Sequence, residues 1–195
     1  MCNIICVTNR KLCVDDFSNR IKRIAETDVS GIILREKDLS VQQYEQLAGV
    51  IMPCAGSKLI IHSFEETAKN LDCKKIHLPM HILRSTKNIS FFGEAGASCH
   101  SAEEAREAEA MGCTYITAGH IFDTDCKKGL PGTGLDFLSE VCRSVNIPVY
   151  AIGGITKDNI SGVIQAGASG VCIMSSLMKC GDPMEYISRL RSAVR

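Results

Sequence analysis

The chain has 195 residues, of which 45% are hydrophobic, which is enough for one domain with a sizeable core. Its 22 basic and 22 acidic residues cancel to a formal net charge of zero, which argues against a global field that favours nucleic acid or a membrane surface. The 11 cysteines are odd in number and form no Cys-x-x-Cys pair, so their spacing matches neither a zinc site nor a secreted disulfide framework.

The cysteines and the absence of long apolar runs indicate where the protein is located and argue against a membrane partner. Cys6 and Cys172 lie inside apolar runs, where a thiol behaves as a small hydrophobe, and a reducing cytosol suits so many free thiols. No signal-peptide pattern opens the chain, and no apolar run reaches 18 residues. We therefore expect a cytoplasmic protein without nucleic-acid or membrane partners. The sequence leaves open whether it forms a homo-oligomer.

Short, nearly continuous apolar runs recur along the chain and predict strands buried on both faces. The fifth is the weakest, because Gly93, Glu94 and Gly96 dilute it. The predicted strands are 4–7, 31–34, 58–61, 75–78, 96–98, 115–118, 149–152 and 170–174.

Amphipathic stretches between the strands predict helices with recognisable ends. Ser40 and Thr156 are predicted N-caps, Ser101 opens a capping-box pattern, and Pro183 suits a first helical turn. The predicted helices cover 15–27, 40–52, 101–112, 156–166 and a last segment that starts at 182.

Eight strand–helix units in this length predict an α/β fold, a single compact (β/α)8 TIM barrel that spans residues 1–195 as one domain. A doubly wound sheet is the structural alternative. Two late strand ends favour the barrel, because the loops after strands seven and eight of such barrels commonly form a phosphate site. These ends are Gly153-Gly154 and Ser175-Ser176.

Residues at the carboxyl ends of the predicted strands are the candidates for chemistry, because active sites of parallel α/β proteins lie there. His120 follows Gly119 at the end of the sixth strand, and a histidine can give and take a proton near neutral pH. Arg35 and Lys37 follow the second strand and could hold a carboxylate or a phosphate.

The stretch after His120 is rich in glycine and proline and carries Lys127 and Lys128. It could fold over an anionic ligand as a lid, although a pair of charges in a loop is often simply solvated. Gly153, Gly154, Ser175 and Ser176 could bind a phosphate through backbone amides and hydroxyls, although Gly-Gly could equally make a tight turn.

Further polar residues near strand ends give weaker signals. Ser98 could bind a ligand oxygen, and His100 could do so or cap the next helix. His62 and His77 could form a two-histidine metal site, but no carboxylate stands beside them, so no metal site is predicted. The thiols Cys99 and Cys126 lie near the expected mouth of the barrel and are interpreted as ordinary thiols.

From Ile5 through Pro183 the chain resembles the thiamine-biosynthesis barrel superfamily, which includes thiamine-phosphate synthase and the TenI thiazole tautomerases. The motifs that carry this resemblance are Leu34-Arg35-Glu36-Lys37, Ile76-His77-Leu78-Pro79, Ser98-Cys99-His100-Ser101, Ile152-Gly153-Gly154-Ile155 and Gln165-Ala166-Gly167-Ala168.

Three stretches distinguish the two branches of the superfamily. Where the synthase branch carries an Asn-Asp pair that serves Mg²⁺ and pyrophosphate, this chain has His62-Ser63. Where that branch carries an acidic residue after the fourth strand, this chain reads Pro79-Met80-His81, so both hard oxygen ligands are missing. Residues 119–129 instead are similar to the TenI run Gly-His-x-Phe-x-Thr-Asp-Cys-Lys-Lys-Gly.

The TenI resemblance implies an isomerase that aromatises a thiazole carboxylate phosphate without a metal or another cofactor. Its substrate is then a small phosphorylated thiazole, and the resemblance gives His120 the proton relay. A fixed cation would stabilise the charge that develops on the carboxylate, and we expect Arg35 in this role, with help from Lys127. The remaining predicted substrate contacts are Lys37, Ser98, Gly153, Gly154, Ser175 and Ser176.

Two alternatives remain at this point. The first is a thiamine-phosphate synthase, a transferase that releases pyrophosphate, with an altered metal site. The second is a catalytically silent regulatory protein of the TenI type that binds a phosphate of the thiamine pathway and gives His120 no chemical task.

Overall fold

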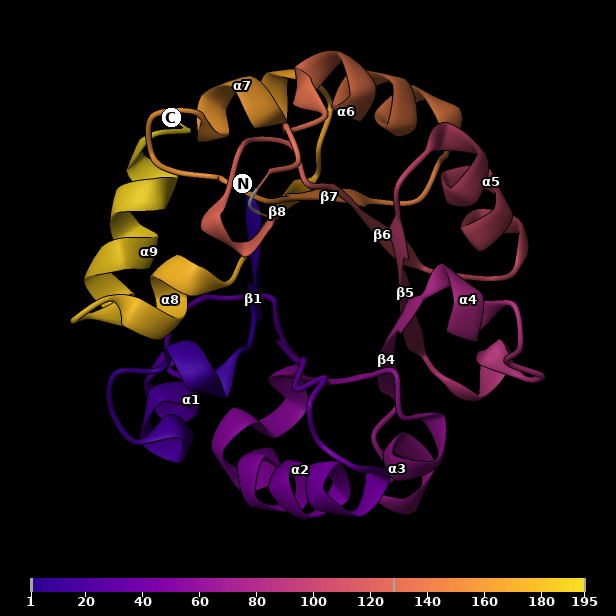
Figure 1. The fold of residues 1–195 in the computed structure, drawn as a ribbon, viewed down its shortest axis with the longest axis vertical. Helices are drawn as coiled ribbons and strands as arrows, with labels where there is room; N and C mark the ends of the chain where they lie inside the picture. Colours follow the sequence, from indigo (N-terminus) through magenta and orange to yellow (C-terminus); the bar gives the residue numbers. More distant parts are fainter. Residues whose placement is uncertain (1, 128, 195) are drawn as a thin grey trace.

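The computed structural model describes residues 2–127 and 129–194. Within them, eight parallel strands close into a barrel in sequence order, with β8 paired to β1 (Figure 1). The (β/α)8 prediction is therefore confirmed, and the open doubly wound sheet is excluded. The strands are β1 (Asn3–Val7), β2 (Gly31–Leu34), β3 (Leu59–His62), β4 (Lys75–Pro79), β5 (Glu94–Cys99), β6 (Tyr115–Gly119), β7 (Val149–Ile152) and β8 (Gly170–Ile173).

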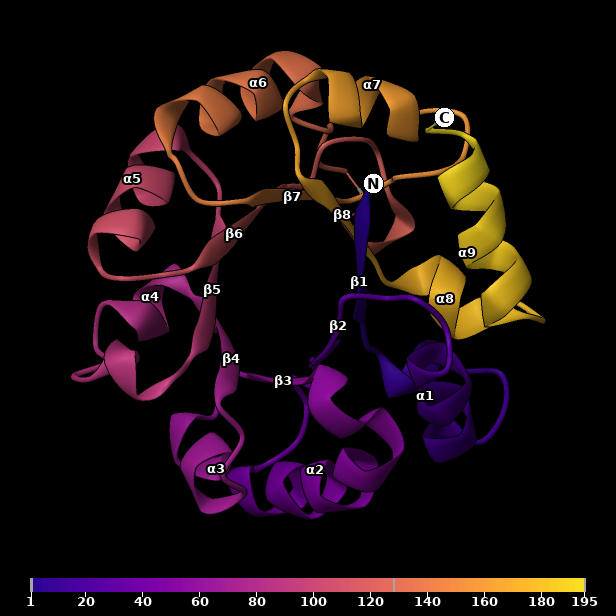
Figure 2. The same ribbon diagram turned by 180° about the vertical axis from the view of Figure 1, so that it is seen from behind.

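The α-helices form an outer ring around the barrel, and the view from behind shows the same arrangement (Figure 2). Their apolar faces pack on the outward side chains of the strands and make the larger hydrophobic core. The helices are α1 (Phe17–Ala25), α2 (Val41–Ala55), α3 (Glu65–Asn70), α4 (Met80–Leu83), α5 (Ala102–Ala110), α6 (Gly134–Ser144), α7 (Ile160–Gln165), α8 (Ser175–Lys179) and α9 (Pro183–Ser192).

Side chains along each strand alternate between the helix-covered core and the barrel interior. In β2, Ile32 and Leu34 join the outer core, whereas Ile33 packs in a second cluster with Ile5 and Tyr115. That cluster fills the lower part of the barrel with apolar groups. Strands β3 to β6 place polar residues in the layer above it, toward the carboxyl ends, namely His62, His77, Ser98 and Thr117.

The helix ends show where local sequence signals act as predicted and where they do not. Ser40 caps α2 in a capping box, and Asp182 caps α9 with Pro183 in the first turn. Thr156 does not cap α7; it starts a turn in which Asn159 accepts the Thr156 N–H, and α7 begins only at Ile160. The prediction of a helix from residue 156 is therefore wrong, because the Asn159 side chain competes for the backbone.

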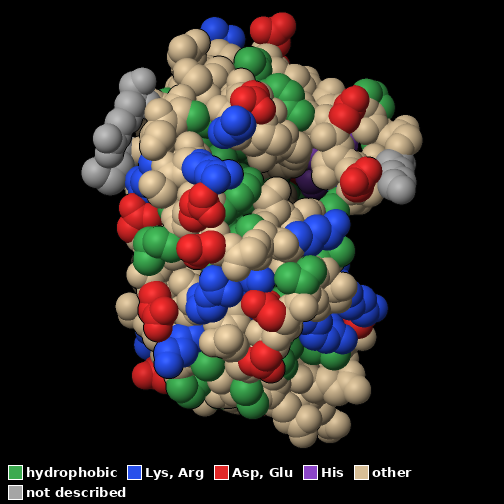
Figure 3. Space-filling model, turned by 90° about the vertical axis from the view of Figure 1, so that its left-hand side faces the viewer, with side chains coloured by type: hydrophobic (Ala, Val, Ile, Leu, Met, Phe, Trp, Pro, Cys, Tyr) green, Lys and Arg blue, Asp and Glu red, His purple; other side chains and the backbone are tan. Residues whose placement is uncertain are grey.

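The described surface mixes charges of both signs. Figure 3 shows acidic and basic side chains interspersed on one face, and no broad field of a single sign is visible there. The eleven cysteines carry no disulfide. Across residues 2–127 and 129–194, none of the helices has the length and apolar character that a membrane span requires. That residues 1–195 form a single domain stays a prediction.

Candidate functional site at the carboxyl ends of the strands

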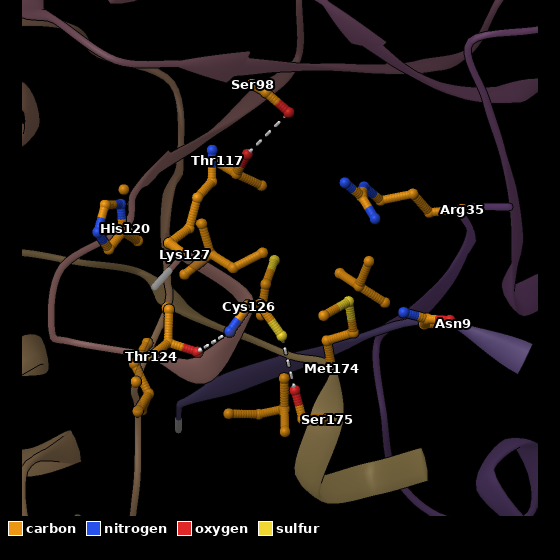
Figure 4. A pocket seen from close by; sticks show the side chains of 18 of the residues that line it. Asn9, Arg35, Ser98, Thr117, His120, Thr124, Cys126, Lys127, Met174 and Ser175 are labelled. Atoms are coloured by element: carbon orange, nitrogen blue, oxygen red, sulfur yellow. Dashed lines mark hydrogen bonds between the residues drawn. The ribbon is translucent and has the colours of Figure 1, made fainter. Parts of the chain in front are cut away.

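A pocket of about 1620 Å³ opens where the carboxyl ends of the strands meet (Figure 4). Strand alternation and the βα loops bring residues from all parts of the chain to this one place. Every predicted site residue lines it, namely Arg35, Lys37, Ser98, His120, Lys127, Gly153, Gly154, Ser175 and Ser176. Lys128 lies outside the described residues.

Arg35 stands two residues beyond Ile33, so its side chain follows the barrel interior into the pocket. Its backbone N–H donates to Thr8 Oγ1 at 2.9 Å, and the Thr8 hydroxyl donates to the buried carboxylate of Glu36 at 2.7 Å. Glu36 also accepts from Arg10, which ties the end of β1 to the end of β2. The backbone at Arg35 is therefore held firmly, while its guanidinium group faces the pocket.

The cations at the pocket repel one another. Burial lowers the pKa of Arg35, against a raising effect of Glu36 and Cys126. Partial burial lowers the pKa of Lys37 too, and the charges of Arg35 and Lys127 add to this effect. Figure 4 shows Arg35 and Lys127 extending into the pocket from opposite sides. Three positive side chains, Arg35, Lys37 and Lys127, therefore face the same pocket.

Asp123 and Asp125 line the same pocket, but in the described part of the chain neither pairs with these cations. Among the described residues, the side chains of Arg35, Lys37 and Lys127 form no ion pair, whereas Arg20 and Lys69, for example, pair with carboxylates. Bringing unpaired like charges together costs free energy, and a bound anion would offset that cost. The arrangement therefore favours an anionic ligand.

The described parts of the β6–α6 loop, residues 120–127 and 129–133, include a segment that packs against the end of β7. The N–H groups of Ile121 and Phe122 donate to the carbonyls of Ile152 and Gly153 at 2.9 and 3.1 Å. Gly154 (φ +65°) must be glycine, because a Cβ there would lie 2.6 Å from the Asp123 carbonyl oxygen. The glycine pair therefore allows the loop to pack closely, in addition to any contact with a ligand.

His120 lies at the edge of the pocket, on the opposite side from Arg35 (Figure 4). Its Nε2 is 3.2 Å from the Leu130 carbonyl oxygen, and because a carbonyl can only accept, Nε2 donates. A Cβ at Gly153 would lie 2.4 Å from His120 Cβ, so these two residues are in direct contact. His120 thus shares the pocket with the glycines while its ring fastens the loop, and its catalytic role stays a prediction.

Ser175 begins α8 beside the β6–α6 loop. Its hydroxyl lies 3.3 Å from Cys126 Sγ, which links this strand end to the loop that carries Lys127. Gly153, Gly154, Ser175 and Ser176 therefore form one wall of the pocket, with Lys127 above it. The geometry is compatible with the predicted phosphate contacts, which remain predictions.

Sequence analysis missed a polar cluster in the upper barrel. His77 Nε2 lies 2.8 Å from Ser98 Oγ, and His77 Nδ1 lies 3.0 Å from the Tyr115 hydroxyl. Thr117 stands 3.5 Å from Ser98. The period of two along each strand could have identified Thr117 and His77 as inward residues, but only cross-strand register brings them together.

Burial favours the neutral form of His77 and of the neighbouring His62, whose ring centroid lies 6.0 Å from that of His77. Burial is the main cause that lowers the pKa of His62 to about 2, and the nearby His77 and Arg35 lower it further. Burial lowers the pKa of His77 to about 3, with a smaller effect of Arg35. In the part of the chain that the structure describes, no three His, Cys, Asp or Glu side chains are grouped so that they could hold a metal ion.

Known proteins with similar sequences carry one activity in their names. The chain is 31% identical to thiamine-phosphate synthase of Syntrophomonas wolfei over 193 residues, which cover 95% of this chain and 92% of the relative. It is 33% identical to thiamine-phosphate synthase of Moorella thermoacetica, over 85% of this chain and 82% of the relative. The solved thiamine phosphate pyrophosphorylase of Pyrococcus furiosus superposes with a TM-score of 0.81 at 26% identity, over 98% and 95% of the two chains.

These relatives overturn the prediction of a thiazole tautomerase. That prediction depended on the two positions that lack a metal-binding carboxylate, at His62-Ser63 and at Pro79-Met80-His81, and on the TenI-like run that follows β6. The similarity to the synthases instead extends over nearly the whole chain, including the strands and helices that build the pocket. A short motif can recur in proteins with different activities, whereas identity over the whole barrel indicates common descent. The isomerase assignment is therefore wrong.

The family comparison agrees with the individual relatives. The family model described as thiamine monophosphate synthase matches residues 4–177, which include every strand but the first residue of β1 and reach Leu177 in α8. The matched range contains all the predicted site residues. The chain therefore belongs to the thiamine monophosphate synthase family, TMP-TENI, and is an enzyme of the TIM-barrel class.

Proposed function

We propose that this enzyme is a thiamine-phosphate synthase, a transferase that joins a pyrimidine pyrophosphate to a thiazole phosphate and releases pyrophosphate. The names of the relatives support this activity, and their similarity extends over most of the chain. The observation that carries the proposal is the group of unpaired cations that faces the pocket, because both substrates are anions and the leaving group is one too.

In this reaction the bond from the pyrimidine methylene carbon to the pyrophosphate oxygen breaks, and its electron pair leaves with the oxygen. The lone pair of the thiazole nitrogen forms the new C–N bond. Arg35, Lys37 and Lys127 would bind the pyrophosphate and stabilise the charge that develops on it. Because Thr8 fixes the backbone at Arg35, this positive charge is in place before the bond breaks.

The thiazole phosphate would occupy the other side of the pocket. Gly153, Gly154, Ser175 and Ser176 offer hydroxyl groups and close backbone approach there. Binding energy from this remote phosphate would orient the thiazole nitrogen toward the methylene carbon. The transfer moves no proton, so in this proposal His120 takes no part in the bond changes. Its role is structural, because it holds the β6–α6 loop through the Leu130 carbonyl.

The family resemblance implies Mg²⁺, but the residues present do not fit it. Mg²⁺ prefers carboxylate and other oxygen ligands in octahedral geometry. At the relevant strand end stands His62, a buried neutral imidazole whose Nδ1 is 2.7 Å from Ser63 Oγ. Asp123 accepts the Gly132 N–H at 2.8 Å, which engages one of its oxygens. We therefore assign no step of the reaction to a metal.

The test is to incubate the protein with the pyrimidine pyrophosphate and thiazole phosphate together, and to measure thiamine phosphate by chromatography and pyrophosphate by an enzyme-coupled assay. We expect the two products in equal amounts, and strongly reduced rates for Arg35→Ala and Lys127→Ala. Absence of both products from an enzyme that binds both substrates would refute the proposal and favour the silent binding protein.

A further inference from the structure

Two buried side chains, Tyr115 and His77, and the half-buried Ser98 form a chain in the upper barrel. The Tyr115 hydroxyl contacts His77 Nδ1 at 3.0 Å, and His77 Nε2 contacts Ser98 Oγ at 2.8 Å. Tyr115 and His77 are 4% and 2% exposed, so water does not replace these contacts. The chain ends at Ser98, which lines the pocket.

The hydrogen positions along this chain follow from counting donors and acceptors. Burial keeps His77 neutral, because it lowers the pKa of the imidazole to about 3, and a neutral ring carries one N–H. Among the described residues, His77 Nδ1 is the one partner within hydrogen-bond distance of the Tyr115 hydroxyl. A buried hydroxyl that donates to nothing costs free energy, so Tyr115 donates and Nδ1 accepts.

The proton of His77 is therefore on Nε2, and it is donated to Ser98 Oγ. A serine hydroxyl has two acceptor positions and one proton. His77 fills one acceptor position, and Thr117 Oγ1 approaches from 3.5 Å, a long and weak contact. The proton of Ser98 has no acceptor on His77 and is free to point into the pocket.

We propose that Tyr115 and His77 are positioning residues that hold Ser98 as a hydrogen-bond donor to an acceptor oxygen of the bound ligand. The inference rests on the proposed function in one respect, since it takes this oxygen to belong to the pyrophosphate group of the substrate. The setting suits a phosphate oxygen, because Arg35 also donates from this pocket (Figure 4).

The first experiment needs no ligand. Nitrogen-15 NMR of the imidazole groups distinguishes the two neutral tautomers and the cation. We expect His77 to be neutral, with its proton on Nε2, at every pH from 5 to 8, and we expect Tyr115→Phe to shift its Nδ1 resonance. A proton on Nδ1, or a protonated ring within this range, would overturn the inference whatever the enzyme catalyses.

The second experiment measures the binding of inorganic pyrophosphate by titration calorimetry. We expect about tenfold weaker binding for Ser98→Ala and about threefold weaker binding for Tyr115→Phe. The double variant should bind as Ser98→Ala does, because Tyr115 acts through Ser98. Losses that multiply in the double variant would refute the positioning role.

Tyr150→Phe is the matched control. The Tyr150 ring packs edge-on against Tyr115 with centroids 5.6 Å apart, but it does not line the pocket. Its variant should bind pyrophosphate as the unmodified protein does. If the unmodified protein binds no pyrophosphate, the proposed function fails, and the NMR tautomer of His77 then decides the inference alone.

Discussion

The Tyr115 ring occupies the space in which a side chain at Gly96 would lie. The two residues are paired across β5 and β6, and a Cβ built on Gly96 would stand 2.1 Å from the Tyr115 ring carbon Cζ. On its other edge Gly96 pairs with His77 in β4. The missing side chain therefore lets a tyrosine cross one strand and reach a histidine on the next.

Gly96→Ala should destabilise the fold. The added methyl group must displace a buried ring, and overpacking of this kind costs about 2 kcal/mol of unfolding free energy. Gly93→Ala is the matched control, since no atom lies within 4 Å of a Cβ at that position. Urea unfolding of both variants gives the comparison.

The same pair allows a check on mechanism. If the clash with the ring is the cause, Gly96→Ala combined with Tyr115→Leu should lose less stability than the two single changes added together. A Gly96→Ala protein as stable as the unmodified one would show that the barrel can absorb the methyl group, and would contradict the expectation.

Pyrophosphate affinity should depend on the unpaired cations of the pocket. Removing Arg35 or Lys127 takes away one fixed charge, and we expect Arg35→Ala and Lys127→Ala each to weaken pyrophosphate binding about tenfold, which is about 1.4 kcal/mol. The effect should shrink at high salt, which screens charges. Calorimetry at two salt concentrations measures both effects.

Lys87→Ala is the control for this experiment, because Lys87 is exposed and lies outside the pocket. An equal loss in Lys87→Ala and Arg35→Ala would mean that overall charge, and not the pocket, determines the affinity.

Acid should unfold this protein through its buried histidines. The pKa values of His62 and His77 lie far below their ordinary value of 6.5, so the unfolded chain binds protons that the folded one does not. The stabilising contribution is complete above pH 6.5 and is lost as the pH falls below it. At pH 5 each histidine should lower the unfolding free energy by about 2 kcal/mol relative to pH 8.

Urea unfolding between pH 8 and pH 5 tests this expectation. His62→Gln should remove about half of the pH dependence, since one of the two titrating groups is gone. A slope that is the same in the variant and the unmodified protein would show that other groups control acid unfolding.

Product formation should proceed in the presence of a strong chelator. His62 and Ser63 offer no carboxylate at the strand end where the synthase pattern has its metal ligands, and the described residues contain no three-ligand cluster. The coupled pyrophosphate assay with and without chelator measures this. A rate that falls to background in chelator and returns with added Mg²⁺ would show that the substrate phosphates bring the metal with them.

Local patterns predicted the barrel because each strand is a short apolar run of its own. They missed α3 (Glu65–Asn70), α4 (Met80–Leu83) and α8 (Ser175–Lys179), which are too short to show helical periodicity, and they also missed the 11-residue α6 (Gly134–Ser144). The site residues at strand ends could be found because parallel strands bring their carboxyl ends to one face. The assignment of the reaction was wrong because it gave most weight to three short stretches, whereas the similarity to the synthases extends over nearly the whole chain.

The Tyr115–His77–Ser98 chain could not be found from local patterns. Each of its residues comes from a different strand, and their contact depends on register between β4, β5 and β6 and on a glycine in the middle strand. Hydrophobic periodicity carries no information on such register. Three-dimensional pairing was needed to turn an isolated histidine into part of a defined hydrogen-bonded unit.

The pairing of β1 with β8 makes one junction of the ring unlike the other seven. Asn3 meets Gly170 across it, whereas every other neighbouring pair of strands is close in sequence. Nearby, Arg191 fastens α9 to the Cys2 carbonyl at 2.9 Å. Joining segments so distant along the polypeptide carries the largest loop-closure entropy cost in the molecule. We therefore expect the β1–β8 pair to form last during folding and to separate first under a pulling force.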